Sequence, residues 1–301
     1  MTWVVDEPER LDRFLARMLP EHSRTKIARQ ITADGAQVEG EVVYKPGIEV
    51  RPGWTISFGE IPESPAHDLT PIPMELDIRY EDDDLLVINK PRGLVVHPAP
   101  GLDEPTLVQG LLARGQSLSQ GSAAFRPGIV HRLDKLTTGL IIVAKSDQSH
   151  QRLAEGIKLK QTERRYVAVV HGKPPHERFS VDAPIGRNPR NPTAMAVTAD
   201  GKSAITHFKV INRLDRGTLV AARLETGRTH QIRVHLAHFG LPVLGDQTYA
   251  PAPFHSGSMQ LHAAFLQFLH PTTGESVVVY AEPPADFLGV EYVGREVMES
   301  W

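Results

Sequence analysis

The 301-residue sequence contains no cysteine. Disulfides, thiolate zinc sites and cysteine nucleophiles are therefore excluded, and a thiol-free chain suits the reducing cytoplasm, where we expect the protein to be located. No apolar run approaches the ~18 residues of a membrane-spanning helix. The longest candidates, such as residues 140–144, have the length of a strand. Residues 1–7 do not combine a basic stretch with an apolar one, so a secretory signal is not expected.

The sequence as a whole also has no excess of basic over acidic residues. The chain has 33 Lys+Arg and 36 Asp+Glu, a net charge of −3, which does not indicate a nucleic-acid partner. The distribution is uneven, however: residues 126–235 hold 20 Lys+Arg and 9 Asp+Glu, a net of +11, and the remainder has a net of −14. A local excess of this kind is typical of proteins that bind a phosphate backbone. The alternative is that these charges are scattered over all faces of the fold.

Length and hydrophobic content indicate about two folded domains, since 41% of the residues are hydrophobic. Residues 1–60 have the pattern of a small, separate module. One apolar stripe at helical spacing predicts a helix that Pro20 ends. Its members are Leu11, Phe14, Leu15, Met18 and Leu19. Four prolines follow within residues 61–76, which we interpret as a semi-rigid linker, and residues 77–301 form the second predicted domain.

A second helix in the first module buries Ile27 and Ile31, and Lys26 and Arg29 lie roughly opposite them, so these cations point outward. Gly35 closes this helix, and short strands with a turn at Gly40 follow. This order of helix, basic helix and small hairpin resembles the S-four-type (αL) RNA-binding domain over residues 10–58. The resemblance implies RNA contacts from Arg24, Lys26 and Arg29. The alternative is an unrelated small α/β lobe.

The second domain mixes helix and strand signals without a regular alternation. Thr106 is placed to cap a helix that carries Leu107 and Leu111. Strand-like runs occur at residues 166–170, 219–224 and 277–280, separated by segments too varied for repeated βαβ units. The expected class is therefore α+β, with a central, mainly antiparallel mixed sheet flanked by helices.

The densest group of reactive side chains is the segment 128–135, which reads GIVHRLDK and precedes an apolar strand. Asp134 lies among three potential cations, His131, Arg132 and Lys135. Nearby cations favour the ionised form of Asp134. An ionised carboxylate can act as a nucleophile or base, or stabilise positive charge at a sugar carbon. The alternative is a loop aspartate in a structural ion pair.

A second group lies in residues 224–235, which read LETGRTHQIRVH. We expect Thr229 to cap a helix in which Ile232 packs inward. Arg233, near the start of that helix, is a suitable partner for a carboxylate such as Asp134. Of His230, His235 and His238, only the last two share helical spacing, and neither a cysteine nor a nearby carboxylate completes a zinc site, so no metal is expected.

A third group, residues 164–172, begins with two arginines and an aromatic residue on a strand-like run. A ring beside cations suits stacking on a base next to a phosphate backbone. By this reasoning Arg164 and Arg165 contact RNA, and Tyr166 contacts a base. The alternative is that Tyr166 is an ordinary strand tyrosine.

Together these segments resemble the RluA/RluD-like family of RNA pseudouridine synthases over nearly the whole chain after residue 76. The motifs that carry the resemblance are residues 80–98, the Asp134 segment, the Tyr166 strand, residues 182–187, residues 201–206, the Arg233 segment and residues 240–246. An S-four-type domain at the N-terminus is the arrangement of the family's large-subunit ribosomal RNA branch. One departure is Leu136, where many members carry an acidic residue; we expect it to alter loop packing without removing the catalytic aspartate.

The resemblance implies the pseudouridine synthase fold and a reaction that isomerises uridine without metal or organic cofactor. Asp134 matches the catalytic aspartate, Arg233 the arginine that pairs with it, and Tyr166 the tyrosine that stacks on the uracil. Whether the aspartate attacks the sugar, attacks the base or takes a ribose proton stays open. Arg132 matches the side chain that fills the space left by the extruded nucleotide. Further expected RNA contacts in this domain are Lys135, Arg164, Arg165, Arg228 and His230.

The favoured hypothesis is thus a monomeric enzyme that modifies 23S ribosomal RNA. A first alternative keeps the chemistry but acts on transfer RNA. A second is a non-catalytic RNA-binding factor in ribosome assembly. A third, a hydrolase with an aspartate nucleophile, would release free uracil.

Overall fold

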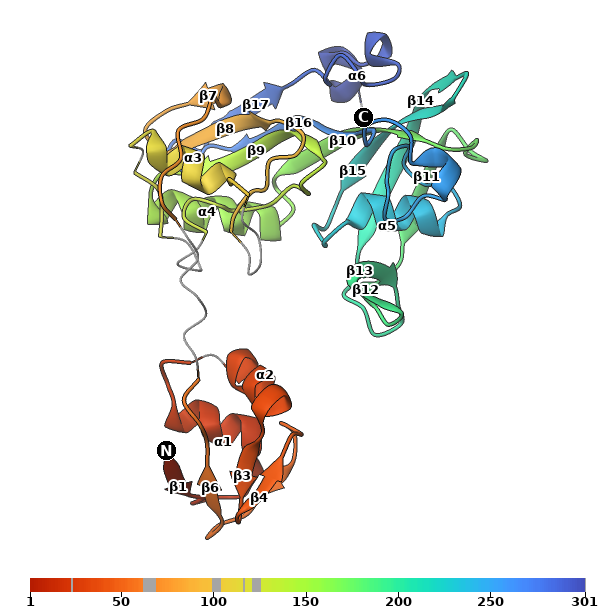
Figure 1. Cartoon of the computed structure of the whole chain (residues 1–301). Coiled ribbons are helices and arrows are strands. Elements are labelled where there is room, and N and C mark those ends of the chain that lie inside the picture. The colour runs from red at the N-terminus through yellow and green to blue at the C-terminus, as the bar shows by residue number, and fades with distance from the viewer. Residues whose placement is uncertain (23, 62–68, 99–103, 116, 121–125, 301) are drawn as a thin grey trace. The chain divides into compact units, whose positions relative to one another are not determined.

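The computed structural model describes residues 1–300 apart from 23, 62–68, 99–103, 116 and 121–125 (Figure 1). It consists of two compact units, Met1–Ala66 and His67–Trp301. Residues 62–68 of the predicted linker lie outside the described residues, and residues 69–76 contain no helix or strand. No described helix has both the length and the apolar character needed to cross a bilayer.

The first unit packs two helices against a small sheet. The expected helices are α1 (Leu11–Met18) and α2 (Arg24–Asp34), and α2 ends at Gly35, whose φ is +81°. The sheet has the order β1-β6-β3-β4. Its strands are β1 (Thr2–Val4), β6 (Thr55–Ser57), β3 (Ala36–Val38) and β4 (Glu41–Val43), and β2 (Glu9–Arg10) pairs with β5 (Glu49–Val50). The predicted apolar stripe of α1 and both isoleucines of α2 join one core.

Nine strands of the described chain form the sheet of the second unit, in the order β11-β14-β15-β10-β16-β9-β8-β7, and β17 also pairs with β16. All pairs are antiparallel except β16 with β9, so the expected mainly antiparallel mixed sheet is confirmed. The strands are β7 (Asp77–Glu81), β8 (Leu85–Lys90), β9 (Thr138–Ala144), β10 (Glu163–Val170), β11 (Arg178–Asp182), β14 (Ile205–Leu214), β15 (Gly217–Leu224), β16 (Leu261–Leu269) and β17 (Ser276–Tyr280).

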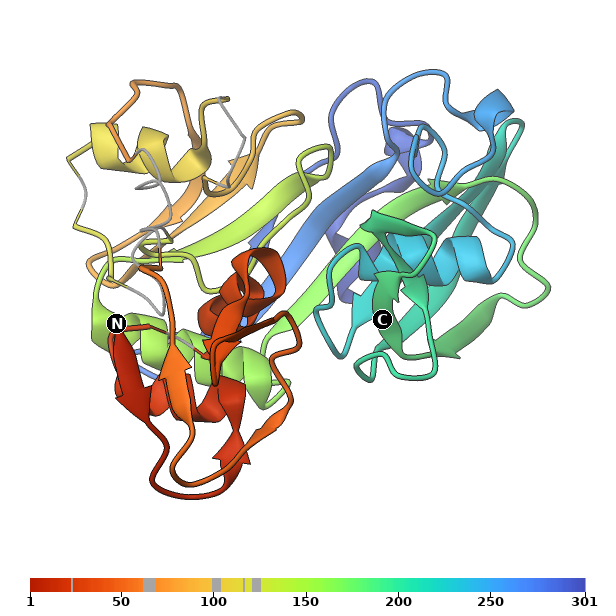
Figure 2. The ribbon, with the colours of Figure 1, turned by 60° about the horizontal axis from the view of Figure 1, so that its bottom comes forward.

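Helices cover the sheet on both faces. They are α3 (Leu107–Ala113), α4 (Asp147–Lys158), α5 (Gln231–His238) and α6 (Arg295–Glu299), with short 3-10 turns η1 (Ala252–Phe254) and η2 (Val290–Tyr292). Thr106 and Gln109 cap α3 reciprocally, which confirms the expected start of that helix. Figure 2 shows α5 lying across the half of the sheet that contains β14 and β15. A hairpin of β12 (Ile185–Asn188) and β13 (Asn191–Val197) stands beside it.

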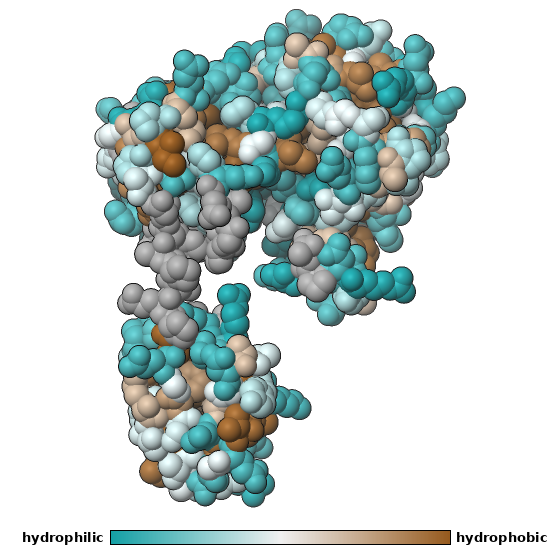
Figure 3. All heavy atoms as spheres, viewed as in Figure 1, coloured by the Kyte–Doolittle hydropathy of each residue, from teal (hydrophilic) through white to brown (hydrophobic). Residues whose placement is uncertain are grey.

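Strand β10 crosses the centre of the sheet and is buried on both faces. Tyr166 and Ala168 pack in the same apolar cluster as Ile232 of α5. Val167 packs in another cluster with Met298 of α6. The alternation of side chains along a strand therefore sends the even-numbered residues of β10 toward α5 and the odd-numbered ones toward α6. These clusters are buried, and the face of the molecule shown in Figure 3 is largely hydrophilic.

Candidate active site

The loop that carries Asp134 leads directly into β9 and is fixed by a buried lysine. Lys90, at the end of β8, has 0% exposure, and its Nζ donates hydrogen bonds to the carbonyls of Pro91, Leu94 and Lys135 at 2.9–3.1 Å. The loop closes with a bond from the amide of Thr137 to the carbonyl of Asp134 at 3.1 Å. These contacts hold the Asp134 backbone just before the start of β9, an internal strand of the sheet.

Gly139 allows β9 to approach β16 closely just after this loop. Its φ is +110°, and a Cβ there would lie 2.3 Å from the carbonyl oxygen of Ala263. This glycine stands in the one parallel pairing of the described sheet, where Ala263 is its register partner. The close approach of the two backbones explains why the position takes glycine.

Arg233 of α5 binds the Asp134 side chain across 99 residues of sequence, with Nη1 2.9 Å from Oδ2. Its Nε and Nη2 donate to the two oxygens of Asp246 at 2.8 and 2.9 Å. Asp246 is fully buried and also accepts the amide protons of Thr248 and Tyr249. Burial raises the pKa of Asp246, but the hydrogen bonds and charge of Arg233 outweigh it and keep this pKa below its ordinary value.

The turn before α5 differs in one residue from the prediction. The cap position is His230 rather than Thr229, and His230 has a left-handed backbone with a φ of +57° and no side-chain cap. The buried side chain of Gln231 instead ties the turn together, since its Oε1 accepts from the hydroxyl of Thr226 and the amide of Arg228. The prediction that Thr229 caps the helix was wrong, because a glutamine inside the helix binds these groups of the turn.

His230 connects Asp134 to a tyrosine. Its Nδ1 lies 2.7 Å from the hydroxyl of Tyr249, which also accepts the amide proton of Met195. Its Nε2 lies 3.8 Å from Oδ1 of Asp134. Burial lowers the pKa of His230, so at neutral pH the ring beside the carboxylate is neutral.

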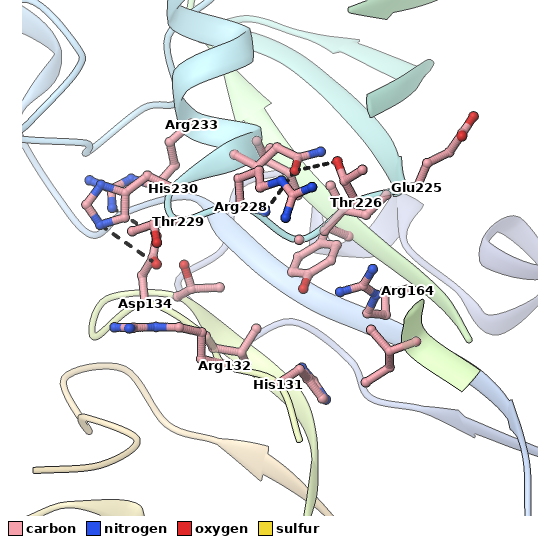
Figure 4. Close-up of a pocket in the computed structure, with 18 of the residues that line it drawn as sticks. His131, Arg132, Asp134, Arg164, Glu225, Thr226, Arg228, Thr229, His230 and Arg233 are labelled. Atoms are coloured by element: carbon pink, nitrogen blue, oxygen red, sulfur yellow. Dashed lines mark hydrogen bonds and ion pairs between the residues drawn. The ribbon is translucent and has the colours of Figure 1, made fainter. Parts of the chain in front are cut away.

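These side chains surround a pocket of about 550 Å³. Asp134, Tyr166 and Arg233 all line it, although they come from a loop, a strand and a helix far apart in the sequence. Arg132, Arg164, Arg228 and His230 line it as well (Figure 4). Tyr166 is only 6% exposed, and burial raises the pKa of its hydroxyl. The pocket thus combines the carboxylates of Asp134 and Glu225, a buried ring and several cations.

The other predicted RNA contacts of this unit differ in whether they line the pocket and in whether they bind another residue. Arg132 is exposed at the pocket, and no hydrogen bond or ion pair joins it to any residue in the described ranges. Arg228 donates from Nε to the carbonyl of Ser203 at 3.0 Å. Lys135 does not line the pocket, and its Nζ lies 2.6 Å from a carboxylate oxygen of Glu104.

Arg165 faces away from the pocket, and its prediction as an RNA contact is corrected. Its guanidinium binds Glu163 and the carbonyl of Met298 and lies 4.7 Å from the centre of the Phe265 ring. Only 7% of Arg165 is exposed. The two neighbouring arginines were treated alike, but strand alternation sends Arg164 to the pocket face and Arg165 to the α6 face.

In the first unit, the predicted RNA contacts lie on α2. Arg29 is exposed and Lys26 is half-buried. Arg24 is half-exposed, and its Nη2 lies 2.9 Å from Oδ2 of Asp12, a buried carboxylate that also binds Arg10. Arg24 therefore has a structural partner on α1 in addition to its exposed surface.

Sequence reasoning did not assign roles to Asp246, Lys90 or Tyr249. Asp246 and Lys90 stand in the family motifs quoted above, at residues 240–246 and 80–98, so a signal was present. Each is an ionisable residue two positions after a short apolar run, and ionisable side chains are rarely buried without a partner. Their partners are distant in the sequence, and only the folded chain identifies them.

One cluster among the described residues has the spacing of metal ligands: Asp82, Asp84 and His270. Nδ1 of His270 accepts the amide protons of Thr272 and Thr273, so its other proton is on Nε2. That Nε2 donates to Oδ2 of Asp82 at 2.9 Å. Since no lone pair of the imidazole is left for a cation, this cluster is a hydrogen-bonded structural network. His235 is likewise occupied, by Thr206 and the carbonyl of Ala183.

Comparison with known proteins agrees with this geometry. The RNA pseudouridylate synthase family matches residues 84–238, and the S4 domain matches residues 9–56, which confirms the expected S-four-type module. A Bacillus subtilis (strain 168) protein, "Uncharacterized RNA pseudouridine synthase YlyB", is 47% identical over 279 residues, covering 92% of this chain and 91% of that protein. "Ribosomal large subunit pseudouridine synthase D" of Xanthomonas campestris pv. campestris is 40% identical over 291 residues, covering 92% and 86%.

Among solved structures, "Human RNA Pseudouridylate Synthase Domain Containing 1" superposes with a TM-score of 0.58 at 28% identity, covering 70% of this chain and 84% of that one. The S4 match lies in the first unit and the synthase match in the second, where its range includes Asp134, Tyr166 and Arg233. The chain belongs to the RNA pseudouridine synthase family and is an RNA pseudouridine synthase with an N-terminal S4 domain.

Proposed function

We propose that this enzyme converts specific uridines of 23S ribosomal RNA to pseudouridine, with Asp134 as its catalytic carboxylate. The choice of RNA is supported by the relatives in Xanthomonas campestris and Vibrio parahaemolyticus, which are named as large-subunit enzymes and are 40% and 38% identical to this chain. We place this activity in the cytoplasm, carried out by a monomer.

The observation that carries the chemical proposal is the pairing of Asp134 and Arg233 beside Tyr166. The Asp134 side chain is 16% exposed, and Arg233 binds its Oδ2, so the second oxygen is the one left for a substrate. Arg233 holds this carboxylate in a fixed orientation through a charge-assisted hydrogen bond. The Tyr166 ring is buried in the wall of the same pocket, where a uracil can stack on it.

A uridine within folded RNA reaches Asp134 only when it leaves the base stack, at a cost of a few kcal/mol. Arg132 is exposed at the pocket and has no partner in the described part of the chain, so it is free to enter the space that the nucleotide vacates. Arg228 and the exposed cations of α2 add phosphate contacts that are independent of sequence. RNA shape then supplies the selectivity.

The test is a map of pseudouridine in total RNA from cells with and without the gene. The proposal expects one or more uridines of 23S ribosomal RNA to lose modification, and expects the wild-type gene, but not Asp134→Asn, to restore it. Asp215→Asn, at the exposed turn between β14 and β15 and outside the lining of this pocket, is the matched control and restores modification. Loss confined to transfer RNA, or no loss at all, contradicts the proposal.

A further inference from the structure

Arg164 is a buried cation without a partner in the described residues. It stands near the start of β10 with 5% exposure, and its Nε is buried and makes no hydrogen bond. No hydrogen bond or ion pair joins its guanidinium to the rest of the described chain. A buried charge is costly unless it is paired. Arg233, on the same pocket, shows the usual solution, since it binds two carboxylates.

The polar groups beside Arg164 do not compensate its charge. Burial lowers the pKa of His131 to about 3, so that imidazole is neutral, and its Nε2 accepts the amide proton of Ile142 at 2.9 Å. Burial raises the pKa of Tyr166, so the phenol is also neutral. Arg164 itself stays protonated, because an arginine side chain does not lose its proton in a protein. The guanidinium of Arg164 therefore carries a positive charge that no neighbouring group in the described chain neutralises.

The charge is directed at the substrate pocket. Arg164 and Asp134 both line it, and Figure 4 shows them on opposite sides. Gly227 makes room for the guanidinium, since a Cβ at this glycine would lie 2.7 Å from Nη1 of Arg164. With Nε enclosed, the η nitrogens are the donors left to face a ligand. A nucleoside with its sugar at Asp134 places its base between the carboxylate and this cation.

The isomerisation creates a negative charge in that position. When the bond between nitrogen 1 of uracil and carbon 1′ breaks, its electron pair goes to the ring and is shared by nitrogen 1 and both carbonyl oxygens. Carbon 5 then forms the new bond to carbon 1′ and loses its proton, and nitrogen 1 takes up a proton. No atom is gained or lost overall. A fixed cation is most effective where charge develops during a reaction.

We propose that the Nη atoms of Arg164 donate hydrogen bonds to a carbonyl oxygen of the target uracil and stabilise the negative charge of the ring while it is detached from the sugar. This inference rests on the proposed function. A backbone phosphate is the other source of anionic oxygens in RNA. It is disfavoured because Arg164 is buried on the same face of β10 as Tyr166, the ring on which the base is proposed to stack.

Two RNA hairpins distinguish a contact of Arg164 with the base from a contact with a backbone phosphate. One carries the uridine identified by the pseudouridine map, and the other has an abasic ribose at that position. Arg164→Gln is expected to lower the single-turnover rate on the uridine hairpin by about 100-fold or more, the usual loss when one such donor is removed. Arg164→Lys keeps the charge and is expected to recover part of this rate. Arg213→Gln, at an exposed arginine of β14 outside the pocket lining, is the control and keeps the wild-type rate.

Binding is measured in the Asp134→Asn background, where turnover does not interfere. Arg164→Gln is expected to weaken binding of the uridine hairpin and to leave the Kd of the abasic hairpin and the salt dependence unchanged. Equal weakening for both hairpins, with the slope of log Kd against log salt reduced by about 1, identifies a phosphate contact and overturns the inference. A wild-type rate for Arg164→Gln overturns it as well.

A second variant guards against misfolding of the first. Gly227→Ala does not change residue 164, but the added methyl group displaces the guanidinium of Arg164. We therefore expect a lower single-turnover rate and unchanged binding of the abasic hairpin. Melting temperatures check both variants, and removal of an unpaired buried charge by Arg164→Gln is expected not to lower this temperature. If the wild-type enzyme leaves the uridine hairpin unmodified, the proposed function fails. If the wild type is active and both variants match it, only the role of Arg164 fails.

Discussion

Arg233 holds Asp134 with one nitrogen and Asp246 with two others, at 2.8–2.9 Å in every case. Asp246 is fully buried, whereas 16% of the Asp134 side chain is exposed. The inner carboxylate therefore fixes the guanidinium, and the guanidinium in turn orients the outer carboxylate toward the pocket. Asp246 acts on Asp134 through Arg233, which makes it a positioning residue.

Replacing Asp246 is expected to affect both stability and activity. Asp246→Ala leaves the buried guanidinium of Arg233 with half of its partners, and breaking a buried pair in this way costs about 3–5 kcal/mol. Urea denaturation should show a fall of this size in the free energy of unfolding. Asp246→Asn, which keeps an oxygen acceptor, should lose less stability and retain more activity. An Asp246→Ala protein as stable as the wild type contradicts the positioning role.

Two glycines beside the Asp134 loop provide a matched pair, since Gly139 follows the loop in β9 and the amide of Gly93 donates to the carbonyl of Lys135 at 2.9 Å. Gly139→Ala would force a Cβ to within 2.3 Å of the Ala263 carbonyl, and its φ is +110°. Gly93 has a φ of +86°, but nothing lies within 4 Å of its Cβ position. Gly93→Ala is therefore expected to cost only the ~1–2 kcal/mol of a left-handed alanine. Gly139→Ala should cost ~1–3 kcal/mol more through overpacking.

Thermal or urea unfolding of the two glycine variants measures this difference. If both lose the same free energy of unfolding, the close approach of β9 and β16 at Gly139 does not constrain the loop as described here.

The local elements and the order of the site motifs were predictable from the sequence. The apolar stripe of α1 and the cap at Thr106 follow from spacing within a few residues, and both are confirmed. The candidate catalytic residues came from family motifs in a fixed order. Their convergence on one pocket is what the structure adds, because Asp134 and Arg233 are 99 residues apart.

Other features depended on contacts that no local pattern records. Arg164 and Arg165 look equivalent in the sequence, but strand alternation sends only Arg164 to the pocket. Thr229 has the right chemistry for a cap, and the long side chain of Gln231 binds the turn instead. Asp246 was visible in a motif, yet its function required knowledge of its partner on α5.

Two buried histidines predict loss of stability in mild acid. Burial lowers the pKa of His131 to about 3 and that of His262 to about 4, from an ordinary value of 6.5. Between about pH 6.5 and 4 the unfolded chain therefore binds more protons than the folded one, so the free energy of unfolding falls as the pH is lowered.

Urea denaturation across pH 4–7.5 tests this prediction. His262→Gln removes one of the two groups and should flatten the curve between pH 6.5 and 4, although its stability at pH 7.5 is lower because the bond from Thr138 is altered. A variant with the same slope as the wild type shows that His262 is protonated in the folded state as readily as in the unfolded chain.

Arg132 is expected to contribute RNA affinity without contributing stability. It is exposed and has no partner in the described part of the chain, so Arg132→Ala should change the free energy of unfolding by less than about 0.5 kcal/mol. A cation in the vacated space also lies next to the phosphate backbone, so its loss should weaken RNA binding and reduce the slope of log Kd against log salt by about 1. Fluorescence titration at several salt concentrations measures both; Arg213→Ala is the control. An unchanged Kd and slope would remove Arg132 from the interface.

The most direct test of the central claim uses purified wild-type and Asp134→Asn proteins in excess over the uridine hairpin. Pseudouridine formation is followed in single turnover, and circular dichroism verifies that both proteins are folded. The asparagine keeps the size of the side chain but removes its charge, so we predict pseudouridine with the wild type and none above background with Asp134→Asn. Conversion by the folded Asp134→Asn protein at the wild-type rate would contradict the assignment of Asp134 as the catalytic residue.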